Sequence, residues 1–470
     1  MNKQLFRQFL GNKKVAILGF GQEGRSTYAR LRSFLPELQI TVCDQDPGII
    51  KQLSATAQND PYTTRHTGPD YLRGLDEADI IVKSPGIPCK VLDPAHTQIP
   101  VTSQTELFVR LYRQQITGIT GTKGKSTTAS LLHHIHEQSG RHSLLLGNIG
   151  VPPFDMIDQI RPDTCIIYEM SSHQLEHIHV SPRYAVMLNI FPEHLDHYAS
   201  FEHYRQAKLN ISRWQTESDL LVYNATNEDL KQLIENCPVK SRKMAIQDTE
   251  TGHECIRIHH DGLHIFLQGE QHCFKGLFSG NKLAGVHNHV NIAAASIMAW
   301  SLGVDQQSIR KAVKSFRGLP HRLELVGSKE NTRFVNDSIS TIPESTIAAI
   351  EAFPDTKTLI LGGFDRGVDY HRLIQFLGRS TPSHIIFTGM AGMRMYQMAL
   401  NNESFRSKHC HFSKRFDDAV WMAIDTVSKG GTCLLSPAAA SYDSFKNFKE
   451  RGDRFRELVQ NWLSQQPSQI

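Results

Sequence analysis

Short apolar runs alternate with stretches of helical spacing along most of this chain of 470 residues. In the first hundred residues, the runs 14–19, 39–44 and 79–83 have the length and the flanking turn residues of buried strands. Residues 25–34 instead repeat apolar positions at helical intervals. Strands that alternate with helices are typical of an α/β fold with a mostly parallel sheet.

The alternation continues to the end of the chain. A chain of this length is too long for one core and suggests about three domains of ~150 residues. The prediction is therefore an α/β protein with domains at 1–113, 114–318 and 319–470. Its later strands are predicted at 163–169, 185–190, 334–338, 358–363, 383–389 and 432–437, and its later helices at 201–214, 288–302, 344–352 and 453–463.

Composition narrows the class of protein. The chain has 51 Lys and Arg against 47 Asp and Glu, and this net charge of +4 does not indicate a nucleic acid or a membrane surface as partner. It has no stretch of ~18 apolar residues, and its first residues lack the apolar core of a signal peptide. Eight cysteines are scattered without a C-x-x-C pair, which predicts reduced thiols in a cytoplasmic protein.

Histidines number 24, and several gather in the segment 253–264. A metal-binding tract is one interpretation of such a cluster. The alternation of apolar residues from Ile256 to Ile265 favours another interpretation, a solvated β-hairpin that turns at Asp261 and Gly262.

The segment 117–127 (TGITGTKGKST) carries the most informative chemistry. Apolar residues precede it and a run of helical spacing follows it, as in a phosphate-binding loop. Backbone N–H groups of the loop and the helix N-terminus would favour phosphate oxygens. Lys125 would reach the β- and γ-phosphates of ATP, and the Ser126 hydroxyl would bind Mg²⁺. Ile119 stands where the usual motif has its first glycine.

A second nucleotide-binding signal, GFGQEG at 19–24, follows the first strand. Asp44 ends the next strand, twenty residues beyond Gly24. This is the pattern of a dinucleotide fingerprint, with a diphosphate at a helix N-terminus and the acid near a sugar or base. The fingerprint alone does not select NAD, because any nucleotide diphosphate fits the same geometry.

Acids and histidines follow two further strands near the phosphate loop. Glu169 ends the strand 163–169, and the segment 191–198 (FPEHLDHY) follows the strand 185–190. Ligands for the Mg²⁺ of an ATP site are expected at such strand ends.

Five motifs in this order resemble those of the Mur ligases, the ATP-dependent amide ligases that build the peptide of bacterial cell-wall precursors. The match covers nearly the whole chain. The stretches SPGI at 84–87 and LSPAAASYDSFKNFKERGD at 435–453 further resemble the glutamate-adding member. The five motifs are TGTKGKS at 120–126, EMSSHQL at 169–175, GVHNHVN at 285–291, GLPHR at 318–322 and NDS at 336–338.

The resemblance implies a Rossmann-like N-terminal domain for a UDP substrate, a central P-loop ATPase domain and a Rossmann-like C-terminal domain for glutamate. The implied reaction joins glutamate to UDP-N-acetylmuramoyl-L-alanine in peptidoglycan synthesis. ATP would convert the carboxylate to an acyl phosphate, which the amine attacks with loss of phosphate. Positioning and electrostatic stabilisation would supply most of the acceleration. ATP, two Mg²⁺ ions, small-molecule substrates and a monomer are implied.

The resemblance also assigns residues to catalysis and to ATP. Lys125, Lys208, His194 and Glu169 are the implied catalytic residues. Ser126 and Glu169 would hold one Mg²⁺ and His194 a second, while Lys208 matches a lysine that the family carbamylates, which places an anion beside the metals. The implied ATP-binding residues are Gly121, Thr122, Lys123, Gly124, Lys125, Ser126, Thr127, Asn288, Asn291, Arg322 and Asp337.

The substrate-binding residues fall in two groups. The fingerprint turn and the neighbouring strand ends would hold the UDP part, a glycine-rich segment the muramoyl-alanine part, and the last domain the glutamate. For the UDP substrate they are Gln22, Glu23, Asp44, Ser84, Gly86 and Asn148, and for glutamate Thr341, Arg366, Ser441 and Phe448.

Departures from the family pattern fall around the amino-acid pocket. In 337–342 (DSISTI), Ile339 replaces a lysine, and in 362–366 (GGFDR), Arg366 replaces the lysine that would meet the glutamate carboxylate. Arginine presents a planar, two-pronged donor where lysine presents a point charge. Tyr442 also stands at a position commonly smaller or differently shaped. The resemblance therefore leaves both enantiomers open, since a variant that adds L-glutamate resembles this chain in the same stretches.

Three alternatives explain less of the sequence. A Rossmann oxidoreductase leaves the phosphate loop, Glu169 and Lys208 without a purpose. A related ligase that adds glutamate to folate has no use for the fingerprint in the first domain. A non-catalytic ATP-binding regulator would be expected to have lost Lys125, Glu169, His194 or Lys208, and all four are present.

Overall fold

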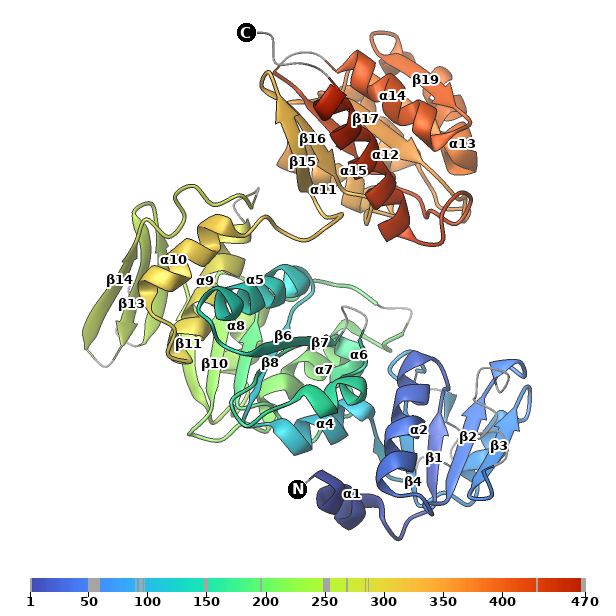
Figure 1. Ribbon diagram of the computed structural model, residues 1–470, viewed down its shortest axis with the longest axis vertical. Helices are drawn as coiled ribbons and strands as arrows, with labels where there is room; N and C mark the ends of the chain where they lie inside the picture. Colours follow the sequence, from blue (N-terminus) through green and yellow to red (C-terminus); the bar gives the residue numbers. More distant parts are fainter. Residues whose placement is uncertain are drawn as a thin grey trace. The chain divides into compact units, whose positions relative to one another are not determined.

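The computed structural model has an α/β fold with three sheets, as the sequence predicted (Figure 1). Two compact units make up the chain, Met1–Asn281 with His287–Ser315, and Lys282–Val286 with Phe316–Ile470. The structure describes residues 2–49, 60–88, 91, 92, 96, 98–147, 151–194, 197–247, 254–267, 269–283, 285, 287–427 and 430–465.

The first sheet is parallel throughout, in the order β3-β2-β1-β4-β5. The strands predicted at 14–19, 39–44 and 79–83 are confirmed. Helix α2 begins at Gln22 and not at residue 25, because the backbone of Gly21 is extended and the helix opens directly from the turn. The elements are α1 Asn2–Leu10, β1 Val15–Leu18, α2 Gln22–Phe34, β2 Ile40–Asp44, β3 Thr63–Thr67, η2 Tyr71–Leu75, β4 Ile80–Lys83, β5 Val101–Thr102 and α4 Gln104–Tyr112.

The second sheet has the order β14-β13-β12-β11-β10-β9-β6-β8-β7. Its strands from β7 to β12 are parallel, whereas β13 and β14 pair in antiparallel fashion. The predicted hairpin at Asp261 and Gly262 is confirmed, since His259 pairs with Gly262. The elements are β6 Ile116–Thr120, α5 Lys125–Gln138, β7 Ser143–Gly147, η4 Pro153–Gln159, β8 Cys165–Glu169, α6 Ser172–Leu175, β9 Tyr184–Met187, α7 Phe201–Arg213, β10 Leu220–Asn224, α8 Glu228–Glu235, β11 Arg242–Ile246, β12 Cys255–His259, β13 Gly262–Leu267, β14 Glu270–Lys275, α9 His287–Ser301 and α10 Gln306–Ser315.

The third sheet lies in the second unit, in the order β15-β16-β20-β17-β18-β19, with only β15 and β16 antiparallel to each other. The predicted start of the last helix was wrong. Helix α15 begins at Phe448, because the Asn447 side chain accepts from the backbone N–H groups of Lys449 and Glu450 at 2.9 and 3.0 Å. The elements are β15 Glu324–Lys329, β16 Thr332–Asn336, α11 Pro343–Ala352, β17 Thr356–Gly362, α12 His371–Arg379, β18 His384–Thr388, α13 Gly389–Leu400, η5 Glu403–Phe405, β19 His409–Ser413, α14 Phe416–Thr426, β20 Thr432–Leu435 and α15 Phe448–Gln465.

A continuous apolar core joins the first and second sheets. The ring of Phe154, which is fully buried, meets the ring of Phe6 edge-on at 5.4 Å. Polar contacts follow the same boundary: Arg30 makes two 2.9 Å hydrogen bonds to Asp158 from η4. This shared core explains why residues of two sheets form one compact unit.

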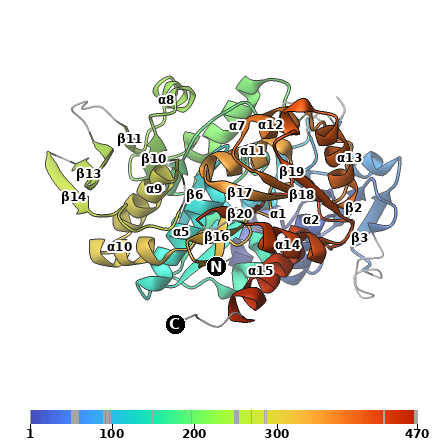
Figure 2. The ribbon, with the colours of Figure 1, turned by 90° about the horizontal axis from the view of Figure 1, so that it is seen from above.

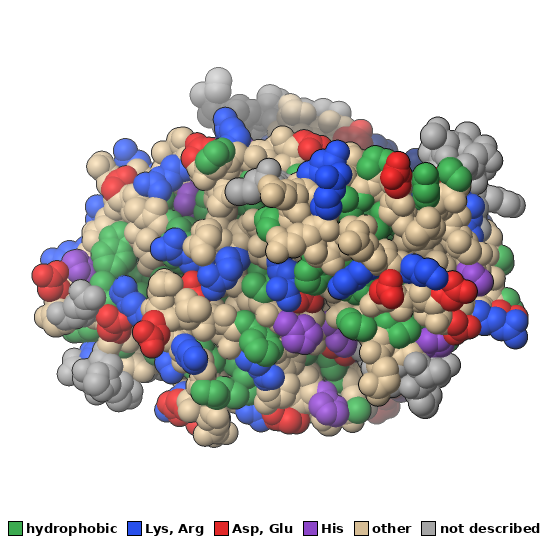
Figure 3. Space-filling view, turned by 90° about the horizontal axis from the view of Figure 1, so that it is seen from below, with side chains coloured by type: hydrophobic (Ala, Val, Ile, Leu, Met, Phe, Trp, Pro, Cys, Tyr) green, Lys and Arg blue, Asp and Glu red, His purple; other side chains and the backbone are tan. Residues whose placement is uncertain are grey.

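The surface agrees with the small net charge. Lysine and arginine side chains are interspersed with aspartate and glutamate on the face shown in Figure 3. Among the described residues, no helix combines the length and apolar character needed to cross a membrane. The seven cysteines that the structure describes are all free.

Replacing Phe154 by alanine is expected to destabilise the first unit by about 3–5 kcal/mol, because lost burial and a new cavity add together. Urea denaturation of the full chain measures the effect. Met390→Ala is a matched apolar control, since the Met390 side chain is 69% exposed. An unchanged midpoint for Phe154→Ala would contradict a core shared by the two sheets.

Candidate functional site

A cavity of about 700 Å³ opens in the first unit between the first and second sheets. The fingerprint turn and the ends of β2 and β4 line one wall. The start of α5, the segment after β8 and helix α7 line the other. The predicted site residues that line this single cavity are Gln22, Glu23, Asp44, Ser84, Gly86, Lys125, His194 and Lys208.

The fingerprint turn is held in shape from both sides. A Cβ atom on Gly24 would lie 2.1 Å from the carbonyl oxygen of Gly19, so only glycine lets α2 pack this closely on β1. The Asp44 carboxylate accepts from the backbone N–H of Phe20 at 2.6 Å, and the Ser84 hydroxyl donates to the Gly19 carbonyl at 2.8 Å. Asp44 and Ser84 therefore support the turn as well as line the cavity.

The phosphate loop connects β6 to α5. Gly124 has φ +87°, and a Cβ there would lie 2.5 Å from Oδ1 of Asn291 on α9, so the position requires glycine. The loop is held by Asn189, whose carbonyl accepts from Thr122 N and whose Oδ1 accepts from Lys123 N at 2.9 and 2.8 Å. Sequence reasoning missed Asn189. It also carried β9 to residue 190, whereas the chain leaves the sheet after Met187 to make these contacts.

Two lysines meet over this loop. Lys125 Nζ donates to the carbonyls of Gly121 and Thr122 at 2.9 and 3.1 Å, and Lys208 Nζ donates to the same Gly121 carbonyl at 2.9 Å. Lys208 is 2% exposed, and its ammonium lies 4.8 Å from the centre of the Tyr204 ring. Burial, and next the charge of Lys125, hold the pKa of Lys208 well below its usual value.

Carboxylates balance part of this positive charge. Glu169 ends β8 and is 1% exposed, and its charge acts on Lys208. Glu193 Oε1 pairs with Lys123 Nζ at 2.7 Å. Burial opposes ionisation of Glu193, but the hydrogen bond and charge of Lys123 prevail and lower its pKa. The cluster of three lysines and two acids is suited to bind phosphate groups.

Histidines gather where the second wall meets the first. The His194 ring lies 4.8 Å from that of His173, which lies 4.2 Å from that of His197. His194 has φ 58°, an uncommon left-handed conformation for a residue with a side chain. Burial, then the neighbouring His197 and His194, lower the pKa of His173 to about 4. The sequence singled out His194 and missed its two neighbours, although His173 stands in the EMSSHQL motif.

The first sheet contributes two buried ionisable groups. Lys83, at the end of β4, donates to the Ile87 carbonyl at 2.5 Å and lies 3.7 Å from Oε2 of Glu176, which follows α6. Glu23 has one carboxylate oxygen shut off from solvent. Burial raises the pKa of Glu23 to about 7, opposed by the charge of Lys83. Sequence reasoning missed Lys83 and Glu176.

Asn288 and Asn291, predicted to bind ATP, lie together at the start of α9. Asn291 Nδ2 donates to Asn288 Oδ1 at 2.8 Å, and both residues are buried. Asn291 Oδ1 also accepts from the Thr128 hydroxyl of α5 at 3.3 Å. The structure therefore brings Asn291 to the phosphate loop. The predicted substrate residue Asn148 lies outside the described residues.

Ser126 and Thr127 lie in the first turn of α5, and the predicted residues from Arg322 on belong to the second unit. Asp337 is buried and accepts from the Ser436 hydroxyl at 2.8 Å and from Leu323 N at 3.2 Å. Burial raises its pKa to about 6, although these bonds and Arg322 oppose the rise. Arg366 donates to the Thr341 carbonyl at 3.2 Å, so these two predicted glutamate residues lie together.

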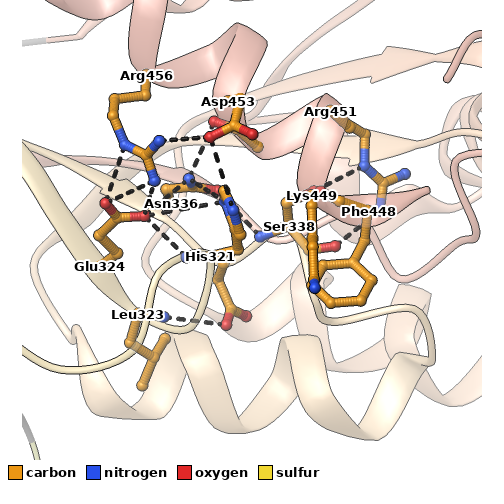
Figure 4. A network of polar contacts seen from close by, with 12 residues as sticks. His321, Leu323, Glu324, Asn336, Ser338, Phe448, Lys449, Arg451, Asp453 and Arg456 are labelled. Carbon is orange, nitrogen blue, oxygen red and sulfur yellow. Dashed lines mark hydrogen bonds and ion pairs between the residues drawn. The ribbon is translucent and has the colours of Figure 1, made fainter. Parts of the chain in front are cut away.

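A polar network holds the GLPHR segment against α15 (Figure 4). Fully buried Asn336 donates to His321 Nδ1 and to the Gly452 carbonyl, each at 3.1 Å. Glu324 accepts from the His321 backbone N–H at 2.8 Å and from the guanidinium of Arg456 at 2.9–3.0 Å. The segment that carries Arg322 is therefore held by Asn336 of β16 and, through Glu324, by Arg456 of α15.

Arg451, also drawn in Figure 4, joins three segments of the second unit. It is 2% exposed and donates to the Ser338 hydroxyl and carbonyl at 3.0 and 2.8 Å, and to the carbonyls of Ala439 and Ala440. The Ser338 hydroxyl donates in turn to the carbonyl of Phe448. Arg451 thus positions the backbone beside the predicted glutamate residues Ser441 and Phe448. Sequence reasoning missed it, although it lies in the stretch 435–453.

Comparison with known proteins decides the family. The description of the matching family model is Mur ligase middle domain, and the match covers residues 119–299. The chain is 33% identical to the UDP-N-acetylmuramoylalanine–D-glutamate ligase of Acetivibrio thermocellus over 98% of its own length and 99% of that protein. The chain belongs to the Mur ligase family. The membership predicted from five motifs is thereby confirmed.

Two further Mur ligases are similar to this chain. The UDP-N-acetylmuramoylalanine–D-glutamate ligase of Elusimicrobium minutum is 33% identical, with 96% of this chain and 98% of that protein covered. A solved ligase of Acinetobacter baumannii, named for UDP-N-acetylmuramoylalanyl-D-glutamyl-2,6-diaminopimelate and D-alanyl-D-alanine, has the same fold. It matches with a TM-score of 0.56 at 14% identity, over 97% of this chain and 98% of that chain.

Glu23→Gln is expected to change how stability depends on pH. The pKa of Glu23 is about 7 in the folded chain against 4.5 for an unperturbed carboxyl. The folded state therefore keeps a proton that the unfolded chain releases. The contribution of this group to stability is fully present below the pKa of the unfolded chain, and it is lost as the pH rises through the pKa of the folded chain. The melting temperature of the wild type, minus that of Glu23→Gln, should fall by roughly 2–4 °C between about pH 5 and about pH 8. A difference that stays constant would contradict a buried, protonated carboxyl.

Proposed function

We propose that this protein is an ATP-dependent ligase that joins the amine of glutamate to the carboxylate of UDP-N-acetylmuramoyl-L-alanine, in peptidoglycan precursor synthesis. One observation carries the proposal: a single cavity is lined by a dinucleotide-type fingerprint turn, by Lys125 of the phosphate loop and by Lys208 of α7. Such a cavity suits a nucleotide diphosphate substrate whose reacting end lies near the phosphates of ATP. Relatives about a third identical over nearly their full length carry the same activity in their names.

The proposed reaction has two steps. In the first, a carboxylate oxygen of the substrate attacks the γ-phosphorus of ATP and the bond to the β–γ bridging oxygen breaks. ADP departs, and the substrate becomes an acyl phosphate. In the second, the glutamate nitrogen attacks the acyl carbon, the tetrahedral intermediate expels phosphate, and the amine proton is released. Lys125, together with the backbone of the loop 121–124, would bind the phosphate groups and stabilise charge that develops on them.

Mg²⁺ fits the residues at the loop. Glu169 is a buried carboxylate at a strand end and Ser126 a hydroxyl at the start of α5, and hard cations prefer such oxygen donors. Ser126 and Glu169 would hold one ion, and His194 a second. Bound there, Mg²⁺ would neutralise charge on the phosphate oxygens.

Lys208 is proposed to act as a carbamate. Its lowered pKa populates the neutral amine more than in an exposed lysine, and a neutral amine adds to CO₂ with loss of one proton. The product is an anion where a cation was, and it would serve as an additional metal ligand. Gly121, which accepts the Lys208 hydrogen bond, would hold this side chain beside the phosphate loop.

Three domains are proposed, each of which binds one substrate. Residues 1–113 would bind the UDP substrate, residues 114–318 ATP and residues 319–470 glutamate. In the last domain, Arg366 would bind a glutamate carboxylate beside Thr341, with Ser441 and Phe448 completing the pocket. Arg322 and Asp337 would contact ATP. The enzyme would act as a monomer in the cytoplasm.

Phosphate release from ATP tests the function. With UDP-N-acetylmuramoyl-L-alanine present, addition of glutamate should start turnover, and Lys125→Ala should abolish it because the phosphates lose their cation. D-Glutamate and L-glutamate are compared side by side. The relatives' names favour turnover with D-glutamate, whereas turnover with L-glutamate alone would assign Ile339 and Arg366 to an inverted pocket. Absence of turnover with both would overturn the proposed substrate.

Lys208→Ala is expected to lower kcat by ~10²-fold or more, because a charged group near the reacting phosphate is lost. Bicarbonate should not restore activity, since alanine has no amine to carbamylate. Labelled bicarbonate followed by NMR should detect a carbamate in the wild type and none in the variant. Lys243→Ala is the control, because Lys243 is an exposed lysine of the same sheet. Wild-type kcat in Lys208→Ala would refute the proposed role.

A further inference from the structure

Four metal-binding side chains gather on the hairpin at the outer edge of the second sheet, away from the cavity. Asp261 Oδ1 lies 2.7 Å from His259 Nδ1 and 2.8 Å from His264 Nε2. Each of these three residues can offer a ligand atom within 4.8 Å of the others. Cys273 Sγ lies 3.5 Å from the same His264 Nε2. Figures 1 and 2 both show β13 and β14 at this edge.

Strand register brings these side chains together. His264 on β13 stands directly opposite Cys273 on β14, and the turn between β12 and β13 carries Asp261 next to His259. Their neighbours Leu263 and Ile265 are fully buried. Because side chains alternate along a strand, His264 and Cys273 share the opposite, outer face of the sheet.

We propose that His259, Asp261, His264 and Cys273 form a binding site for one zinc ion. In a tetrahedral zinc site, sulfur and nitrogen ligands lie about 3.5 Å apart and two nitrogen or oxygen ligands about 3.3 Å apart. The sulfur–nitrogen separation between Cys273 and His264 already has this value, and the two shorter contacts must open by about 0.5 Å. The Cys273 thiol must also move toward the other two ligand atoms, because the group that already lies within 4.8 Å of one another is His259, Asp261 and His264. Half-exposed side chains at a turn make such a movement easy. Binding replaces the thiol proton of Cys273, which is released to solvent, by a bond to zinc.

The donor set selects a transition metal over Mg²⁺. Imidazole nitrogen and thiolate sulfur suit Zn²⁺, whereas Mg²⁺ prefers an octahedron of oxygens. Gln271 supports the site, since its side-chain amide contacts Nδ1 of His264 at 3.2 Å. With zinc on Nε2, Nδ1 carries the proton and the Gln271 amide accepts it after rotation, as outer partners of metal-bound histidines do. The site is therefore chemically separate from the Mg²⁺ ligands proposed at the phosphate loop.

Zinc would fasten the edge of the sheet. Among the described strands, β14 pairs with β13 alone, so the edge depends on one ladder of backbone hydrogen bonds. A metal bonded to β12, the turn, β13 and β14 adds covalent-like links across all three strands. Backbone amides of 255–275 should then exchange with solvent more slowly when zinc is bound.

Titration of the chelator-treated full chain with Co²⁺, and then Zn²⁺, tests the proposal. One Co²⁺ per chain should give the intense visible bands of a tetrahedral ion and a thiolate charge-transfer band, and Zn²⁺ should displace both. Cys273→Ser should lose the charge-transfer band. His264→Ala should weaken binding by more than the roughly 10–100-fold that loss of an outer partner costs.

His272→Ala is the matched control. His272 is the neighbour of Cys273 on β14, but its ring lies 5.0 Å from that of Trp300 and is not part of the site. This variant should bind Co²⁺ as the wild type does. His259→Gln provides a second ligand variant if His264→Ala fails to fold, and ligase activity should be unchanged in both. Absence of tetrahedral Co²⁺, or equal binding by wild type, His264→Ala and His259→Gln, would overturn the proposal.

Discussion

The apolar core shared by the first two sheets is the constraint on which the site depends. Parallel strands place their carboxyl ends at one edge, so each sheet alone could offer only one wall of loops. Packing around Phe154 and the paired Arg30 and Asp158 fixes the two edges to each other. A cavity that is lined by two nucleotide-binding signals follows from this packing. Neither the fingerprint turn nor the phosphate loop could define it alone.

Charge within that cavity is arranged for a ligand. Lys123, Lys125 and Lys208 meet at one loop, and among the described residues Glu169 and Glu193 oppose their charge. Burying Lys208 beside another lysine is unfavourable for its charged form, which is why its pKa is depressed. Phosphate groups would relieve the repulsion between the lysines. Strain of this kind is expected at functional sites, where the binding of the ligand offsets its cost.

Local pattern was enough to predict much of this molecule. Apolar runs in the sequence predict buried strands such as β1 and β8, and the alternation of apolar and polar residues predicts the hairpin at Asp261. Long-range contacts left no such signal. Asn189 supports the phosphate loop from a distant strand end, and Arg451 acts through backbone carbonyls that any residue could supply. The early start of α15 was missed for a related reason, since its cap at Asn447 lies in a polar stretch without periodicity.

In the second unit, the buried polar residues that hold the scaffold are distinct from the exposed residues that can be substituted. Its polar interior is tightly paired: Asn336 and Arg451 hold the segment at Ser338, the loop at 439–440 and α15 in fixed register. Two of the three departures from the family pattern lie outside this interior, and the third, Ile339, is half-buried next to Ser338. Arg366 and Tyr442 are exposed, and the Tyr442 ring lies 6.2 Å from the exposed ring of Phe364.

Exposed positions can change without leaving a buried charge or an unpaired donor, so substitution there costs little stability. A change at Asn336 or Arg451 would instead break several buried hydrogen bonds at once. If Arg366 binds glutamate as proposed, the preference among amino-acid substrates can change at such exposed residues while the scaffold that positions Asp337 and Arg322 stays intact. The same separation explains how the residues proposed to bind ATP can follow the family pattern while those proposed to bind glutamate depart from it.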